Sequence, residues 1–158
     1  MSSADKSLSH FSNPLPDGSA CRIGIVVAEW NEAVTGALLA GCRDTLTEAG
    51  VKQENVLTKF VPGTFELALG AQLLCTQDLH AVICLGCVVQ GETRHFDFIC
   101  DAAAQGIMRV GLDSAKPVIF GVLTTDDQEQ ALERAGGKHG NKGSEAAYTA
   151  LRMLEEFK

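Results

Sequence analysis

The sequence predicts a three-layer α/β/α sandwich on a four-stranded parallel sheet, and three observations support this. Strand-like and helix-like segments alternate along the chain from residue 21 onward. Residues 23–27 and 82–85 are continuously apolar, as strands covered by helices on both faces require. In the segment after His95, apolar residues recur at steps of three and four, which indicates a helix with one buried face. Such alternation with right-handed crossovers is typical of a flavodoxin-like arrangement.

The chain has the length of one domain, and a short arm precedes its periodic part. Its 158 residues match the usual size of a single domain with its own core. Residues 1–19 are polar, contain Pro14, Pro16 and Gly18, and show no sustained periodicity, which is typical of an arm. We therefore expect an N-terminal arm at 1–19 and one domain at 20–158.

Four strands are predicted, and turn residues bound them. The second strand ends at the turn residues Pro62 and Gly63, and Pro117 introduces the fourth. In chain order, the predicted strands span residues 21–28, 55–61, 81–89 and 118–123.

Helices follow the strands, and the last one closes the chain. The helix after the third strand has its apolar stripe at Phe96, Ile99, Ala103, Ile107 and Val110. The final helix repeats this pattern with Ala147, Leu151, Leu154 and Phe157. The predicted helices span residues 32–49, 65–76, 94–112, 127–135 and 144–157, and a glycine-rich connection at 136–143 separates the last two.

Composition and charge exclude several classes of partner. Thirteen basic and twenty acidic side chains give a net charge of −7, which repels nucleic acid. A small anionic substrate would therefore need a locally positive pocket. No segment approaches the roughly 20 apolar residues of a membrane-spanning helix, and the first twenty residues lack the pattern of a secretory signal. We expect a cytoplasmic protein that binds neither membrane nor nucleic acid.

The six cysteines are predicted to be buried, reduced thiols and not a metal or redox site. Cys84 and Cys87 have CxxC spacing, but they lie on a predicted strand, where residues three apart point to opposite faces. One zinc ion cannot bind both, and no second ligand pair follows. We therefore predict no metal site.

Ligands of open parallel sheets gather at the carboxyl ends of the strands, so the residues after each strand are the candidates. Trp30, the only tryptophan, follows the first strand and is either a platform for a ligand ring or a packing residue. Asn31 is a candidate for ligand binding or a plain helix N-cap.

The second strand leads into a turn and a helix start. Gly63 allows close backbone approach, Thr64 can cap the helix, and Phe65 offers an aromatic face. Glu66 is weak evidence by itself, because the helix dipole favours an acidic residue in the first turn.

The third strand is followed by Gly91 and the start of a long helix, which together form a candidate anion site. The segment matches neither a Walker loop nor a GxGxxG turn. His95 lies beside this site, and an imidazole is a side chain suited to proton transfer near neutral pH. Asp97 either orients a catalytic group or only stabilises the helix start.

A fourth group combines Phe120, near the predicted end of the last strand, with basic residues around the glycine-rich connection. These are Arg134, Lys138 and Lys142. The alternative for Arg134 and Lys138 is a plain role as cations at a helix C-terminus.

Four patterns in one order resemble a known family. They are Trp30-Asn31, PGTFE, GxxxxGETRHFD, and PVIFGVLTT with QALERAGGKHGNKG. Over residues 22–157 the chain resembles the 6,7-dimethyl-8-ribityllumazine synthases of the riboflavin pathway. The resemblance implies condensation of 5-amino-6-(D-ribitylamino)uracil with 3,4-dihydroxy-2-butanone 4-phosphate, with release of phosphate and water and with no cofactor.

The resemblance also implies roles for residues. His95 is the proton donor and acceptor, and Trp30 stacks on the pyrimidine. Asn31 and the main chain of Thr64, Phe65 and Glu66 hold the ring edge and ribityl hydroxyls, and backbone groups of Cys87, Val88 and Val89 form the pocket floor. Glu92, Thr93 and Arg134 bind the phosphate; Phe120 comes from an adjacent subunit, and Lys142 is a further candidate. Two positions depart from the common pattern: Gln90 stands where a basic residue is frequent, and Glu92 where a small one is usual.

Family members form pentamers with the active site between neighbours, and some build shells. The connection at 136–143 carries no insertion, so we expect a 60-subunit shell, with a pentamer or decamer as the alternative. Riboflavin synthase is a candidate partner. Two rival functions are a flavin or lumazine carrier and a purely structural shell protein.

Overall fold

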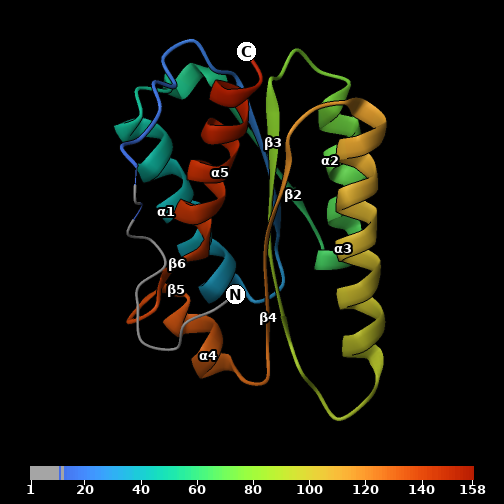
Figure 1. Cartoon of the computed structure of the whole chain (residues 1–158). Helices are drawn as coiled ribbons and strands as arrows, with labels where there is room; N and C mark the ends of the chain where they lie inside the picture. The colour runs from blue at the N-terminus through green and yellow to red at the C-terminus, as the bar shows by residue number, and fades with distance from the viewer. Residues whose placement is uncertain (1–10, 12) are drawn as a thin grey trace.

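A computed structural model describes residue 11 and residues 13–158 of the chain (Figure 1). Residues 1–10 and 12, most of the predicted arm, lie outside the described residues.

The sheet has four parallel strands, as predicted. They are β1 (Ile23–Ala28), β2 (Val56–Val61), β3 (Ala81–Val89) and β4 (Val118–Thr125), in the spatial order β2-β1-β3-β4. Because all four strands run the same way, their carboxyl ends meet at one edge of the sheet. The predicted three-layer α/β/α sandwich is confirmed.

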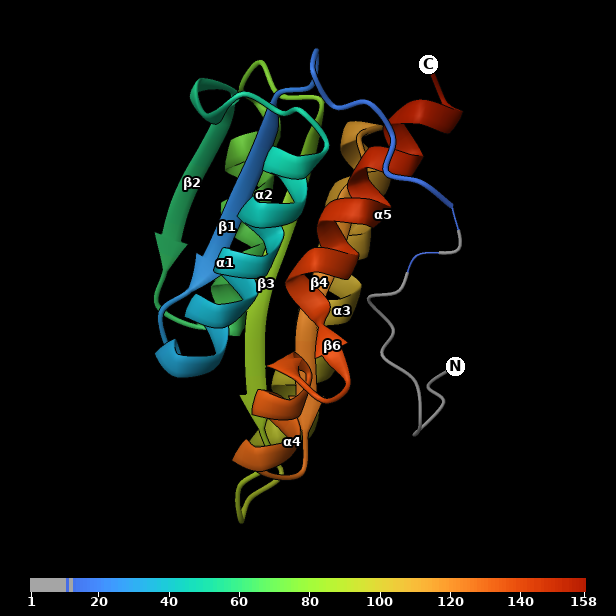
Figure 2. The ribbon, with the colours of Figure 1, turned by 90° about the vertical axis from the view of Figure 1, so that its left-hand side faces the viewer.

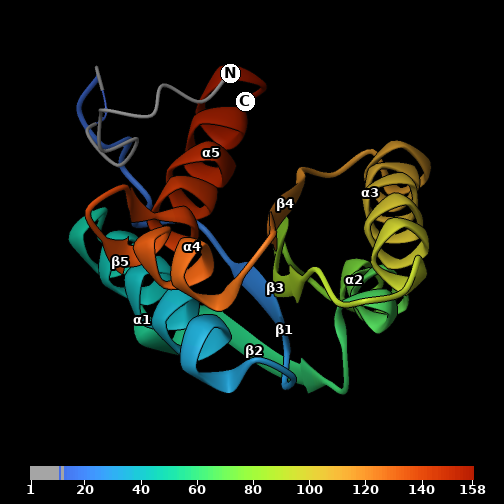
Figure 3. The ribbon, with the colours of Figure 1, turned by 90° about the horizontal axis from the view of Figure 1, so that it is seen from below.

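Helices cover both faces of the sheet. In the described part of the chain, α1 (Glu32–Glu48), α4 (Gln128–Glu133) and α5 (Lys142–Glu156) lie on one face, and α2 (Leu67–Cys75) and α3 (His95–Ser114) lie on the other (Figures 1 and 3). Short 3₁₀ turns precede β2 at Gln53–Asn55 and α2 at Thr64–Glu66.

Two apolar clusters form the core, one on each face of the sheet. All six residues of β1 are buried, in agreement with its continuous apolar run. On β3, Cys84 belongs to the cluster under α2 and α3, whereas Cys87 belongs to the cluster under α1 and α5. The prediction that these two thiols face opposite sides is confirmed.

Three predicted details are wrong. The glycine-rich connection contains a small hairpin, β5 (Ala135–Gly137) with β6 (Gly140–Asn141), in which Gly136 and Gly140 adopt φ of 110° and 85°. The hairpin lets α5 begin at Lys142, two residues earlier than predicted. Phe120 is not near the end of its strand, because β4 continues to Thr125. Phe157, expected on the buried stripe of α5, is 77% exposed.

The described part of the arm packs on the domain. Leu15 contacts the cluster under α1 and α5, and the Gly18 amide donates a hydrogen bond of 2.7 Å to the Ala49 carbonyl. The ring of Phe11 stacks on Tyr148 of α5 with centroids 4.0 Å apart. Figure 2 shows this segment running beside α5.

Candidate active site at the carboxyl edge of the sheet

The turn after β1 presents Trp30 to solvent. The Trp30 side chain is 68% exposed, so it does not fill the core. Its ring lies against Gly63, where a Cβ atom would come within 2.7 Å of Cε3 and 2.8 Å of Cζ3. The Trp30 amide also donates to the Pro62 carbonyl at 3.1 Å. Gly63 therefore lets the turns after β1 and β2 meet, and an aromatic face stays open.

Asn31 and Thr64 join these turns to the end of β3. The Asn31 amide nitrogen Nδ2 donates to the Cys87 carbonyl at 2.9 Å, and Thr64 Oγ1 donates to the same oxygen at 3.4 Å. Asn31 occupies the N-cap position of α1 with φ 61°, but its side chain forms no capping bond. The simple N-cap alternative is therefore wrong, since the side chain fixes β3 instead.

Phe65 and Glu66 begin the segment that leads into α2. Phe65 is 56% exposed at the same edge as Trp30. Glu66 is partly buried, and its Oε2 accepts a hydrogen bond of 3.1 Å from the Gly63 amide. The carboxylate thus holds the turn on which Trp30 rests.

The end of β3 forms the floor of the candidate site, and the loop after β3 borders it. Cys87 is buried, whereas Val88 and Val89 are partly exposed. The Gln90 amide donates to the Thr125 carbonyl at 2.8 Å, so the loop departs at the end of β4. Burial raises the pKa of the Cys87 thiol to about 11, which makes it a poor nucleophile at neutral pH.

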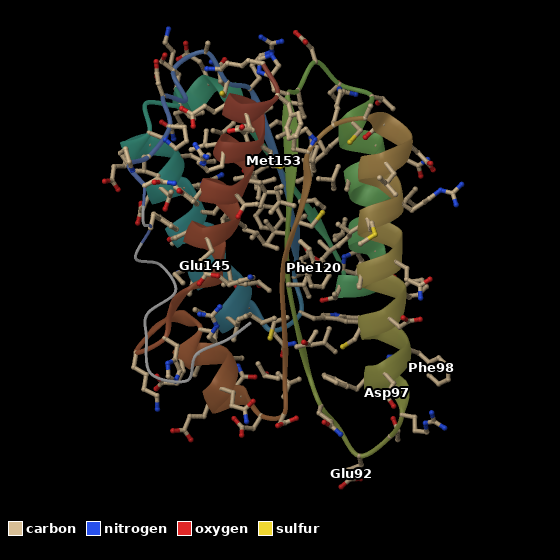
Figure 4. All side chains as sticks on the ribbon, in the orientation of Figure 1. Glu92, Asp97, Phe98, Phe120, Glu145 and Met153 are labelled. Carbon is tan, nitrogen blue, oxygen red and sulfur yellow. The ribbon has the colours of Figure 1, made fainter. Side chains whose placement is uncertain are left out.

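The loop between β3 and α3 carries Glu92 and Thr93, and it leads into His95; all three residues are exposed. Glu92 lies at the tip of the loop, away from the sheet (Figure 4). The His95 amide donates to Thr93 Oγ1 at 3.4 Å, and His95 is the first residue of α3. Asp97 lies 3.7 Å from Arg94 in an exposed pair, which favours its simpler role at the helix start.

A second group of predicted residues faces a groove at the β4 edge of the sheet. Phe120 pairs with Cys84 of β3, three residues before Cys87, which corresponds to about 10 Å along a strand. Phe120 is 37% exposed and lines a cavity of about 780 Å³ between α3 and α5. Lys142 lines the same groove, whose walls are mainly apolar residues such as Leu112 and Met153.

Arg134 is fixed behind this groove by two acceptors. Its Nη1 donates to the His139 carbonyl at 2.6 Å, and its Nη2 donates to Glu145 Oε2 at 3.3 Å. Lys142 Nζ lies 3.4 Å from the same Oε2 atom. Arg134 does follow α4 at its C-cap, but its guanidinium binds the hairpin and α5 and not the end of α4. Glu145 was not predicted from the sequence, where its only signal is its position three residues after Lys142.

The two groups come from different parts of the fold. His95 begins α3 on one face of the sheet, whereas Arg134 and Lys142 belong to the layer of α1, α4 and α5 (Figures 1 and 3). We call Trp30, Asn31, Thr64, Phe65, Glu66, Cys87, Val88, Val89, Glu92, Thr93 and His95 the ring half-site. We call Phe120, Arg134, Lys142 and Glu145 the cation half-site.

The described residues hold neither a metal-binding cluster nor a membrane-spanning helix. No cluster of three or more His, Cys, Asp or Glu side chains within that part of the chain is arranged to hold a metal ion. No helix there has the length and apolar character to cross a membrane. All six cysteines are free; four are buried, whereas Cys75 and Cys100 are partly exposed, contrary to the prediction for these two.

The fold is that of an α/β protein with a parallel sheet, a class that binds its ligands at the carboxyl ends of the strands, where the ring half-site lies. The family model for 6,7-dimethyl-8-ribityllumazine synthase matches residues 20–158. Proteins of that name from Cytophaga hutchinsonii and Parabacteroides distasonis are 60% and 52% identical to the chain over 157 and 156 residues. These alignments cover 99% and 98% of both chains, and a third, from Porphyromonas gingivalis, is 52% identical over 155 residues, 97% of this chain and 96% of its own. The chain belongs to the 6,7-dimethyl-8-ribityllumazine synthase family.

Proposed function

We propose that this chain condenses 5-amino-6-(D-ribitylamino)uracil with 3,4-dihydroxy-2-butanone 4-phosphate in a site shared by two neighbouring subunits. Membership of the family makes the chain a transferase of riboflavin biosynthesis, and this condensation is the family reaction. The observation that carries the shared site is the separation along the sheet between the ring half-site, at the carboxyl ends of β1, β2 and β3, and Phe120, which lies beside Cys84 in a groove at the β4 edge.

The ring half-site binds the pyrimidine. Trp30 offers an exposed aromatic face, and the contact of its ring with Gly63 fixes the position of that face relative to the sheet. The backbone of Thr64, Phe65 and Glu66 and the floor at Val88 and Val89 contact the ring edge and the ribityl hydroxyls. The Cys87 carbonyl already accepts two hydrogen bonds, so its part is to hold Asn31 and Thr64 in place.

The cation half-site of the neighbouring subunit completes the cavity. Phe120 covers the second face of the substrate ring, and Arg134 with Lys142 meets the phosphate that the loop amides at Glu92 and Thr93 also bind. The exposed position of Glu92 at the loop tip keeps its carboxylate away from that phosphate (Figure 4).

The chemistry needs orientation and proton transfer and no cofactor. The amine attacks the ketone to form an imine with loss of water, and phosphate is eliminated. After tautomerisation, the ribitylamino nitrogen closes the ring on the remaining carbonyl with loss of a second water. His95, exposed at the start of α3, moves protons between these steps. Holding the two reactants together supplies most of the acceleration.

Exposed surfaces at the β4 edge and on α3 support a ring-shaped assembly. β4 is an edge strand beside an apolar groove, and Phe98, Met108 and Leu112 project from α3 with 68%, 68% and 72% of their surface exposed. Such surfaces need a partner, and a head-to-tail contact between unlike surfaces closes into a ring. We propose a pentamer built into a 60-subunit shell, with the pentamer or decamer as the alternative and riboflavin synthase as a candidate partner.

Two further assignments complete the proposal. Residues 1–19 form an arm, and residues 20–158 form the catalytic domain, a division that the span of the family model supports. The protein acts in the cytoplasm, as six free cysteines are typical of a reducing compartment.

Mixing the two substrates with the protein tests this function. We expect lumazine absorbance to appear together with an equal amount of inorganic phosphate. Binding of the pyrimidine without turnover would instead favour a carrier, and assembly without either would favour a purely structural protein.

The phosphate assignment has its own test in Arg134→Ala. Loss of a charge-assisted bond of about 1.5–3 kcal/mol predicts a higher KM for the phosphorylated ketone. An unchanged KM for that substrate would remove Arg134 from the site.

A further inference from the structure

Glu145 is a carboxylate enclosed by the two cations of the cation half-site. Its side chain is 14% exposed, and those of Arg134 and Lys142 are 20% and 31% exposed. Its Oε2 accepts hydrogen bonds from Arg134 Nη2 at 3.3 Å and from Lys142 Nζ at 3.4 Å. Figure 4 shows Glu145 on the α5 side of the space that separates this helix from Phe120 on β4.

The second carboxylate oxygen has no hydrogen bond of its own. Glu145 Oε1 is buried and lies 3.2 Å from Arg134 Nη1, close enough for ion pairing. One N–H of that nitrogen donates to the His139 carbonyl at 2.6 Å, and Oε1 accepts no hydrogen bond from the group. A buried, incompletely paired carboxylate costs free energy, and its position between two cations indicates an electrostatic role beyond folding.

We propose that Glu145 is a charge-balancing residue that weakens the hold of Arg134 and Lys142 on phosphate. This inference rests on the proposed function, in which these two cations bind the phosphate of the ketone. Two cations and one carboxylate leave a local net charge of +1 instead of +2. The substrate phosphate, once eliminated, must leave as inorganic phosphate from the same cations, and Glu145 competes with it for them. Glu145 thereby sets the balance between binding the phosphorylated ketone and releasing the product.

The test is inhibition by inorganic phosphate in the assembled enzyme. Removal of one charge a few ångströms from a bound phosphate in a partly hydrated site changes affinity by about tenfold. In Glu145→Gln we expect the inhibition constant for phosphate to fall by about that factor. The KM for the phosphorylated ketone should fall with it, and the KM for the pyrimidine should stay the same. The charge-matched control is Glu48→Gln, an exposed residue at the far end of α1, which should change none of these.

A charge-compensating cycle separates this role from a purely structural one. Lys142→Gln should raise the inhibition constant about tenfold, and Lys142→Gln combined with Glu145→Gln, again at +1, should return it towards the wild-type value. The double variant removes both charges of the Lys142–Glu145 pair, so it is informative even if Glu145→Gln alone does not fold.

Three results would overturn the proposal for Glu145. The first is an inhibition constant for phosphate that is unchanged or higher in folded Glu145→Gln. The second is a double variant whose inhibition constant is as high as that of Lys142→Gln. The third is failure of both Glu145 variants to fold. Failure of the phosphate site itself is distinguishable, because Arg134→Gln would then leave the KM for the ketone and the phosphate inhibition unchanged.

Discussion

Gly63→Ala tests how Gly63 positions the Trp30 ring, and it leaves Trp30 itself unchanged. Gly63 has φ −140° and ψ 177°, an extended backbone that alanine adopts without strain. The new Cβ would lie 2.7 Å from Trp30 Cε3 and 2.8 Å from Cζ3. Carbon atoms in contact stay about 3.5–4.0 Å apart, so the ring must move by about 1 Å. Because Trp30 is 68% exposed, the ring can move without unfolding the domain.

The displacement should weaken stacking, whereas Glu66 Oε2, which would lie 3.1 Å from the new Cβ, needs to move by only a few tenths of an ångström. An aromatic pair contributes about 0.5–1.5 kcal/mol, which corresponds to about a two- to tenfold higher KM for the pyrimidine. Trp30 is the only tryptophan, so its fluorescence reports the movement directly. The control is Gly36→Ala on α1, where a Cβ would meet nothing within 4 Å. Unchanged fluorescence and an unchanged KM in Gly63→Ala would refute the assignment of Trp30 as the stacking platform.

Three other variants test catalysis, pH dependence and packing. His95→Ala should lower turnover by about 10²-fold in steady-state assays, because His95 supplies proton transfer and not positioning; complete inactivity of a folded variant would contradict this. Burial raises the pKa of Cys42 from 9.0 to about 12, so above pH 9 the unfolded thiol loses its proton while the folded one keeps it. The free energy of unfolding should then fall by about 1.4 kcal/mol per pH unit for this thiol between pH 9 and 12. In urea unfolding, Cys42→Ala should lose less stability than the wild type as the pH rises through this range. An equal loss of stability in the two proteins would contradict this prediction. Gly143→Ala would place a Cβ 1.9 Å from the Leu38 carbonyl oxygen and force α1 and α5 apart, at a cost of at least about 1–3 kcal/mol in thermal unfolding; a wild-type Tm would show that the helices are not tightly packed there.

The sequence predicted the elements whose signal is carried by many residues at once. The apolar run of β1 and the stripe of α3 at Ala103 and Ile107 are such signals, and both are buried as expected. The CxxC pair was also interpreted correctly, because the alternation of side chains along a strand decides on which side each thiol lies.

Features that depend on a few tertiary contacts could not be predicted in this way. The hairpin at 135–141 depends on positive φ at Gly136 and Gly140, which glycine permits but does not require. The side chain of Asn31 reaches the Cys87 carbonyl, 56 residues away in the chain, although its position in sequence suggested a helix cap. The role of Glu145 likewise appears only when α5 brings it between Arg134 and Lys142.

Co-assembly of two defective variants tests the shared site most directly. One variant, His95→Ala, has an intact cation half-site, and the other, Arg134→Ala, has an intact ring half-site. In a ring assembled from equal amounts of both, about one interface in four joins two intact halves, so about a quarter of the wild-type activity should appear at low ketone concentration. Activity no higher than the mean of the two separate variants would contradict the account, because it would mean that both halves act within one chain.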